Sequence, residues 1–139
     1  MMKYLLDTHT LLWVTENSDK LTDTVISIIT DPDAIKYISI ASAWEVAIKS
    51  STGKLQLHGG LSEFFRMIHT NNANILPINQ QYLEKLANLP FIHKDPFDRL
   101  LIATALAEDM SILTADENIH KYNVSWIWGD PAKREETIE

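Results

Sequence analysis

The chain alternates short apolar runs with helical patterns from its first residues almost to its end. The apolar runs have the length of strands, and the segments between them carry apolar residues at helical spacing. The runs lie at residues 3–6 (KYLL), 37–40 (YISI), 74–78 (NILPI), 111–114 (SILT) and 124–128 (VSWIW). Strands that are separated by helices are joined by crossovers, which favours parallel pairing and places helices on both faces of the sheet. The alternation therefore predicts an α/β fold with three layers around a central, mainly parallel β-sheet.

The helical segments are expected to begin near residues 8, 21, 42, 61, 79 and 97, with a short helical turn at 116–121. Gly53 suits the left-handed position that follows a helix, so we expect the helix that starts at Ser42 to end there. Trp44 and Phe97 share helical spacing with other apolar residues, and both are expected in the core.

Length and composition favour a single domain. The 139 residues, 45% of them hydrophobic, suffice for one core. We expect this domain to span residues 1–129 and to be followed by a polar tail at 130–139. The absence of cysteine excludes disulfides and fits a reducing cytoplasm. Because no apolar stretch approaches the roughly 20 residues of a membrane helix and no signal-peptide pattern is present, we expect a cytoplasmic protein.

Four acidic residues fall just after the predicted strands or early in the predicted helices. They are Asp7, Glu45, Asp98 and Asp116. The carboxyl ends of parallel strands meet at one edge of a sheet, where open α/β folds bind their ligands. Carboxylates gathered at that edge would bind a hard cation. The pattern indicates metal-dependent chemistry on phosphate.

Helix capping is the alternative explanation for each acid taken alone. The capping positions are Asp7, Asp95 and Asp116 as N-caps, Asp98 in a first turn, and Ser42 with Glu45 as a capping box. Caps do not require carboxylates, because Ser, Thr and Asn serve as well, and clustered charges repel one another. Helices that follow parallel strands nevertheless all begin at the same edge. The residues alone leave both explanations open.

The net charge of −7 is unusual for a protein that binds nucleic acid, because phosphate binding normally uses a basic surface. Bound divalent cations would neutralise a carboxylate cluster. Lys49, Lys54, Lys94 and Arg99 remain available to contact a phosphodiester. A basic protein partner would also suit the acidic chain.

Four ordered segments resemble the PIN-domain nucleases, specifically the toxins of VapBC-type toxin-antitoxin pairs. The segments are YLLDTHTLLW (4–13), SAWEVAIKSSTGKL (42–55), HKDPFDRLLIATAL (93–106) and ILTADENI (112–119). The resemblance runs from Tyr4 to about Trp128. It implies a PIN-like three-layer α/β/α sandwich and an endoribonuclease that depends on Mg²⁺ or Mn²⁺.

The resemblance also assigns roles to individual residues. Asp7, Asp98 and Asp116 would hold the metal, and Glu45 would orient or deprotonate the attacking water or complete the metal shell. The supporting positions that it implies are Thr8 and Thr114 as hydroxyls beside the acids, Asp95 as a cap or outer-shell residue, and Arg99 as a phosphate contact. A surface salt bridge is the alternative role for Arg99.

The family also implies an RNA substrate, a homodimer and a VapB-type antitoxin that occupies a groove near the active site. Two other classes remain to be separated by experiment. A phosphatase of the haloacid dehalogenase type would need a second Asp two residues after Asp7, where His9 stands. A non-catalytic binding module with the PIN fold would bind partners without turnover.

Overall fold

The computed structural model describes residues 2–129. The tail expected at residues 130–139 lies outside the described residues. Within them, a single sheet has the strand order β3-β2-β1-β4-β5, and every neighbouring pair is parallel. The strands are β1 (Lys3–Leu6), β2 (Ile35–Ser39), β3 (Ala73–Leu76), β4 (Ser111–Leu113) and β5 (Trp126–Ile127). The predicted α/β class is confirmed.

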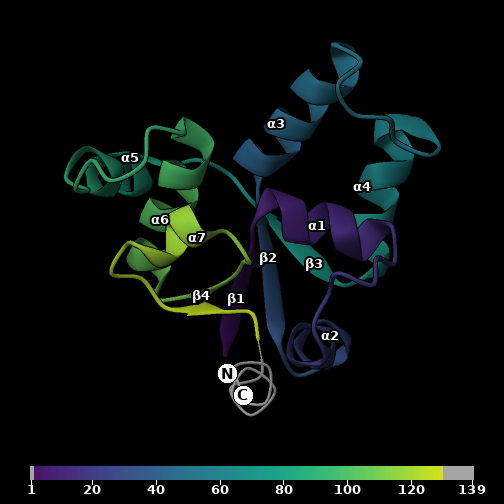
Figure 1. Cartoon of the computed structure of the whole chain (residues 1–139), viewed down its shortest axis with the longest axis horizontal. Helices are drawn as coiled ribbons and strands as arrows, with labels where there is room; N and C mark the ends of the chain where they lie inside the picture. The colour runs from purple at the N-terminus through teal and green to yellow at the C-terminus, as the bar shows by residue number, and fades with distance from the viewer. Residues whose placement is uncertain (1, 130–139) are drawn as a thin grey trace, which may run out of the picture.

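Helices cover both faces of this sheet, which gives the three layers that the sequence predicts (Figure 1). The helices are α1 (Thr8–Thr15), α2 (Asp23–Thr30), α3 (Ile40–Ser51), α4 (Gly60–Thr70), α5 (Gln80–Ala87), α6 (Pro96–Glu108) and α7 (Glu117–His120). No helix in the described part of the chain has the length and hydropathy that crossing a membrane requires.

Alternate residues of the central strand β1 face the two halves of the core. Tyr4 and Leu6 pack in one cluster with buried residues of α1, α2, α3 and α4. Leu5 packs in the other cluster, with Leu101 and Ile102 of α6. The period of two along a strand produces this division. A strand that is buried on both faces must be apolar throughout, which explains why the strands read as continuous apolar runs.

The strand order places a switch point at the carboxyl ends of β1 and β4. From β1 the chain proceeds outward through β2 to β3 and then returns to pair β4 with the other side of β1. Connections leave neighbouring strands in opposite directions at such a point, which opens a crevice at the carboxyl edge. The fold therefore provides a binding position beside Asp7.

Two local predictions are wrong. Helix α3 begins at Ile40, not at Ser42, because Ser39 has an extended backbone and its hydroxyl accepts a hydrogen bond from the Ala41 amide at 3.1 Å. Ser42 is therefore buried inside the helix. Trp44 does not lie in the core either, since 59% of its surface is exposed.

Candidate active site

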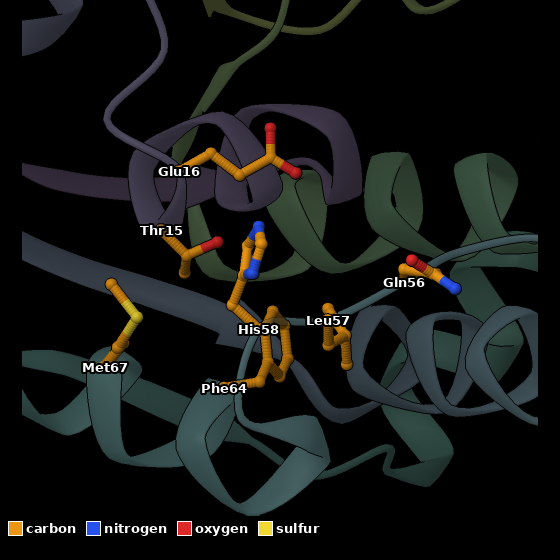
Figure 2. Close-up of a pocket in the computed structure, with 7 residues that line it drawn as sticks. All are labelled: Thr15, Glu16, Gln56, Leu57, His58, Phe64 and Met67. Carbon is orange, nitrogen blue, oxygen red and sulfur yellow. The ribbon is translucent and has the colours of Figure 1, made fainter.

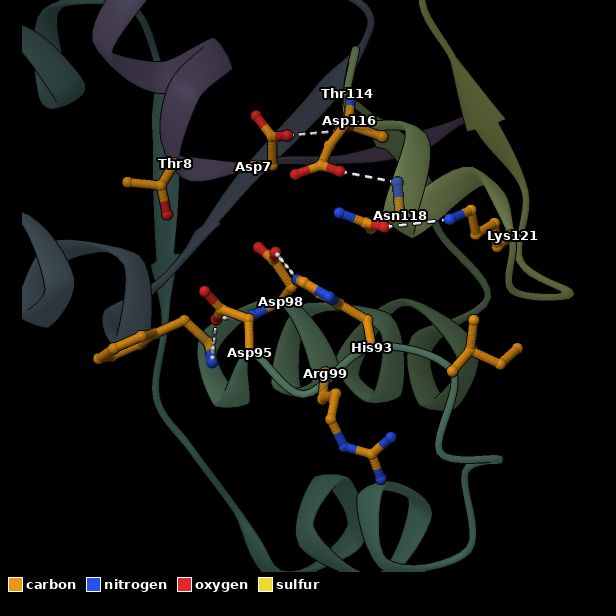
Figure 3. A network of polar contacts seen from close by, with 12 residues as sticks. Asp7, Thr8, His93, Asp95, Asp98, Arg99, Thr114, Asp116, Asn118 and Lys121 are labelled. Atoms are coloured by element: carbon orange, nitrogen blue, oxygen red, sulfur yellow. Dashed lines mark hydrogen bonds and ion pairs between the residues drawn. The ribbon is translucent and has the colours of Figure 1, made fainter.

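Asp7 and Asp116 lie together at the carboxyl edge of the sheet. Asp7 directly follows β1, and Asp116 comes three residues after the end of β4. Both line a pocket of about 230 Å³, to which His9 and Trp13 of α1 also contribute. Figure 3 shows the two carboxylates turned toward the same space. The pairing of β1 with β4 thus brings together acids that are far apart in the sequence.

The Asp7 carboxylate is buried and fixed at both oxygens. Its Oδ1 accepts the Thr10 amide at 2.7 Å and so caps α1, while Oδ2 accepts a hydrogen bond from the Thr114 hydroxyl. Burial raises the pKa of Asp7 above its usual value, although the hydrogen bonds from Thr114 and Thr10 act in the opposite direction. Asp7 is both a cap and a member of the cluster.

The Thr114 side chain connects the first acid to the last. While its hydroxyl donates to Asp7, the same Oγ1 accepts the Asp116 amide at 3.0 Å. Asp116 then caps α7, because its Oδ1 accepts the Asn118 amide at 2.8 Å. A single buried hydroxyl therefore links the Asp7 carboxylate to the backbone of Asp116.

Glu45 reaches the cluster from the second turn of α3. Its Oε1 accepts a hydrogen bond from the Thr8 hydroxyl at 2.8 Å, and its Oε2 pairs with Lys49 at 3.1 Å. Thr8 Oγ1 also lies 3.1 Å from the hydroxyl of Ser42. Thr8 and Thr114 are thus both hydroxyl partners of cluster carboxylates.

Asp98 lies in the first turn of α6, where Asp95 is the N-cap. Asp95 Oδ1 accepts the amides of Phe97 and Asp98 at 2.9 and 3.1 Å. Burial and the negative charges of Asp95, Asp116, Asp7 and Glu45 raise the pKa of Asp98 to about 7. The charges of all four other acids act on Asp98, so Asp7, Glu45, Asp95, Asp98 and Asp116 lie near one another as a carboxylate cluster.

His93 belongs to this site, although the sequence analysis did not select it. Its Nε2 lies 3.3 Å from Oδ2 of Asp98, and Figure 3 shows the ring turned toward that carboxylate. The only sequence signal was a histidine two residues before the cap of α6, and this spacing does not by itself predict a contact.

The structure does not bring Arg99 to the carboxylates. Its guanidinium is buried on the far side of α6 (Figure 3) and donates to the carbonyls of Pro90 and Leu86 and to the Tyr122 hydroxyl. Position 99 is one residue after Asp98, so the helix turns it away from the cluster. Both earlier hypotheses for Arg99, a phosphate contact and a surface salt bridge, are therefore wrong, and its role is to join α6 to the end of α5.

We expect Arg99→Met to lower the free energy of unfolding by about 1 to 3 kcal/mol, because it removes the guanidinium hydrogen bonds to the Pro90 and Leu86 carbonyls and to the Tyr122 hydroxyl. Urea denaturation of the purified protein measures this change. Arg66→Met is the matched control: Arg66 is exposed and pairs with Glu63 on the surface, so its loss should change stability much less than the loss of Arg99. Equal effects of the two substitutions would contradict the structural role of Arg99.

A second pocket of about 290 Å³ lies at the other end of α1 (Figure 2). It is lined by Thr15, Glu16, Gln56, Leu57, His58, Phe64 and Met67. Glu16 is its single carboxylate, so this pocket lacks the grouped acids found at the carboxyl edge.

Comparison with known proteins agrees with this geometry. The model of the PIN domain family matches residues 4–124, which is well over half of the chain and includes every member of the carboxylate cluster. The chain belongs to the PIN domain family. PIN domains are generally nucleases that use divalent metal ions. No curated protein sequence matches the chain significantly.

Solved structures share the PIN fold at low sequence identity. A chain of VapBC2 from Rickettsia felis, bound to a DNA fragment from its promoter, has a TM-score of 0.71 and 13% identity over 91% of this chain and 99% of that one. For VapBC-1 from Haemophilus influenzae the TM-score is 0.61 and the sequence identity is 20%, over 91% of this chain and 97% of that one. For a toxin-antitoxin complex from Klebsiella pneumoniae the TM-score is 0.62 and the sequence identity is 18%, over 89% of this chain and 95% of that one.

The cluster fits the divalent cation that PIN nucleases generally use. Its acids offer carboxylate oxygens, which are the ligands that Mg²⁺ and Mn²⁺ prefer. Burial raises the pKa of Asp98, and repulsion from the four other acids raises it further. A cation would relieve this repulsion, so the residues present match the group that the family implies.

Proposed function

We propose that this PIN domain is the toxin of a toxin-antitoxin pair, and that it hydrolyses RNA phosphodiester bonds in the cytoplasm with Mg²⁺ or Mn²⁺. The observation that carries the proposal is the convergence of Asp7, Glu45, Asp98 and Asp116 at the switch point of the sheet. Three structures of toxin-antitoxin complexes with the same fold support the biological setting.

Asp7, Asp98 and Asp116 are the residues that would hold one or two divalent cations. When bound, such cations activate water, shield the phosphate oxygens and stabilise the leaving oxygen. Thr114 keeps Asp7 and Asp116 in position through its two hydrogen bonds. Glu45, held by Thr8 and Lys49, orients the attacking water or accepts its proton.

A groove beside the cluster presents two lysines to the flanking phosphates of the substrate. It has a volume of about 300 Å³ and lies between α3 and the start of α6. Lys49 and Lys54 line it together with Glu45, Asp95 and Phe97. These lysines, and not Arg99, are the side chains that would contact the phosphates.

Incubation of the purified chain with a mixed RNA pool, a matched DNA pool and a phosphate monoester tests the reaction class. We expect RNA cleavage with Mg²⁺ or Mn²⁺, none with EDTA, and no release of inorganic phosphate from the monoester. Phosphate release would indicate the phosphatase class, and inactivity of the folded chain on every substrate would favour a binding module.

The antitoxin that fits this chain carries a basic segment. The pocket formed by Asp7, His9, Trp13 and Asp116 combines carboxylates with an aromatic wall. An arginine or lysine side chain placed there would neutralise the acids and block the cation position. The net charge of −7 also attracts a basic partner to the chain as a whole.

Helix α3 carries the surface that suits a homodimer. Ile40, Trp44 and Ile48 recur every four residues, so they form one exposed stripe, with 37%, 59% and 40% of their surfaces accessible. The Trp44 ring contacts Phe97 of α6 edge-on, with centroids 5.3 Å apart. Apolar surface gathered in this way marks an interface, and a two-fold axis would place identical stripes against each other.

We expect Trp44→Glu to convert the dimer into a monomer, because it places a charge at the centre of the paired stripes. The dissociation constant should rise by more than about tenfold, which corresponds to about 1.4 kcal/mol. Sedimentation velocity over a range of concentrations measures this shift. Leu83→Glu, at a residue of α5 that is 51% exposed, is the control for added charge on an apolar surface residue. An unchanged dimer with Trp44→Glu would exclude this stripe as the interface.

A further inference from the structure

His93 lies where it can contribute to the cation site directly. One ligand atom from each of His93, Asp95 and Asp98 lies within 4.8 Å of the other two. The closest pair is His93 Nε2 and Asp98 Oδ2, at 3.3 Å. Two neighbouring ligands of an octahedral ion, each at about 2.1 Å, are separated by about 3 Å. The imidazole and the carboxylate therefore have nearly the spacing of two ligands on the same ion.

The position of His93 is set by a buried hydroxyl. Its backbone amide donates to the Tyr122 hydroxyl at 2.9 Å, and the same hydroxyl accepts Arg99 Nη1 at 3.1 Å. The residue is thus tied to α6 and to the chain after α7 before any cation binds. Its side chain is 23% exposed, so the ring is held at the rim of the cluster and still reaches solvent.

Asp95 has one carboxylate oxygen that its capping hydrogen bonds do not use. Its capping hydrogen bonds both use Oδ1, which leaves Oδ2 available as a ligand. Capping and ligation are therefore compatible in this residue. The three side chains together offer one imidazole nitrogen and carboxylate oxygens from two residues.

We propose that His93, with Asp98 and Asp95, forms a mixed nitrogen–oxygen cation site at the rim of the carboxylate cluster. The inference rests on the proposed function, which requires a divalent cation at this edge. An imidazole ligand favours transition metals over Mg²⁺, whereas an all-carboxylate site does not discriminate in this way. The chain should accordingly bind Mn²⁺ more tightly than Mg²⁺ because of His93.

Pulsed electron paramagnetic resonance of Mn²⁺ added to the metal-free chain tests the ligand itself. We expect nitrogen modulation from a coordinated imidazole, and a change in its pattern when the histidines are labelled with ¹⁵N. His93→Gln should abolish the modulation and weaken Mn²⁺ binding by about 10- to 100-fold, with a smaller effect on Mg²⁺ measured by calorimetry. Circular dichroism establishes that the variant is folded.

His9→Gln is the matched control, because His9 lines the neighbouring pocket with Asp7 and Asp116. Its removal should leave the nitrogen signal intact. Bound Mn²⁺ without histidine modulation, or modulation that is lost with His9→Gln and kept with His93→Gln, would overturn the inference while leaving the nuclease proposal untouched. Failure to bind Mn²⁺ in a wild-type chain that binds Mg²⁺ would also overturn only the inference, whereas failure to bind either ion would overturn both. If histidine coordinates Mn²⁺ in a chain that cleaves no RNA, the cation site at His93 is supported and only the proposed function is refuted.

Discussion

We expect Asp7→Asn to reduce RNA cleavage by more than about 100-fold, because it removes a proposed direct metal ligand, and substitution of residues around such ligands already reduces function by about 10- to 100-fold. The fold should be retained. Asparagine keeps an oxygen to accept the Thr10 amide and cap α1, and its amide group can donate to the Thr114 hydroxyl. Burial already disfavours the charge of Asp7, so its removal relieves a desolvation penalty.

The measurement compares initial rates on a mixed RNA pool with Mg²⁺ or Mn²⁺, using wild-type and variant proteins that are purified identically. Contaminating ribonucleases would cleave equally in both samples. Asp19→Asn is the control substitution, because Asp19 is exposed and lies outside the carboxylate cluster. Full activity of Asp7→Asn in an EDTA-sensitive reaction would refute the assignment of the site.

The fold and the cluster could be predicted because they depend on patterns that are local in the sequence. Strands buried on both faces must be apolar along their whole length, as the buried Leu5, Ile38 and Ile112 illustrate. An acid that follows such a strand lies at the carboxyl edge whatever the order of the strands. Asp7 and Asp116 therefore met as predicted, although the sequence gives no indication that β1 pairs with β4.

The errors concern features that depend on tertiary contacts. Helical spacing shows that Trp44 shares a face with Ile40 and Ile48, but it does not show whether that face is covered. The environment of Arg99 depends on where α5 ends, since its partners there are backbone carbonyls. His93 approaches Asp98 from the loop before α6, where its backbone amide donates to the hydroxyl of the distant Tyr122. None of these contacts has a periodic signature.

Capping and catalysis turn out to be compatible explanations for the same acids. Asp7, Asp95 and Asp116 each cap a helix through Oδ1. The second oxygen of Asp7 takes the hydroxyl of Thr114. Helix starts supply the backbone donors that orient a carboxylate, and the parallel sheet places these starts side by side. An active site of this kind therefore arises from the same geometry that makes the acids good caps.

Without cations, the free energy of unfolding of this chain should decrease as the pH rises from about 4 to about 7. The folded-state pKa of Asp98 is about 7, and its ordinary value is 3.8. Between these values the folded protein holds a proton that the unfolded chain has released, so raising the pH favours unfolding. The raised pKa of Asp7 acts in the same direction. Asp98→Asn should flatten the dependence, because the asparagine does not titrate.

Divalent cations should reverse this loss at pH 7. Consider a cation that binds only the folded state. When its free concentration is one hundred times its dissociation constant, it raises the free energy of unfolding by about 2.7 kcal/mol. For a chain of this size the gain corresponds to an increase in Tm of about 8 °C. Thermal denaturation at pH 5 and pH 7, with Mn²⁺ or with EDTA, measures both effects. The increase should be larger at pH 7, where the carboxylates are free of protons, and much smaller in Asp98→Asn. An equal Mn²⁺ effect in wild type and Asp98→Asn would show that the ion binds elsewhere, because the repulsion that it relieves is centred on Asp98.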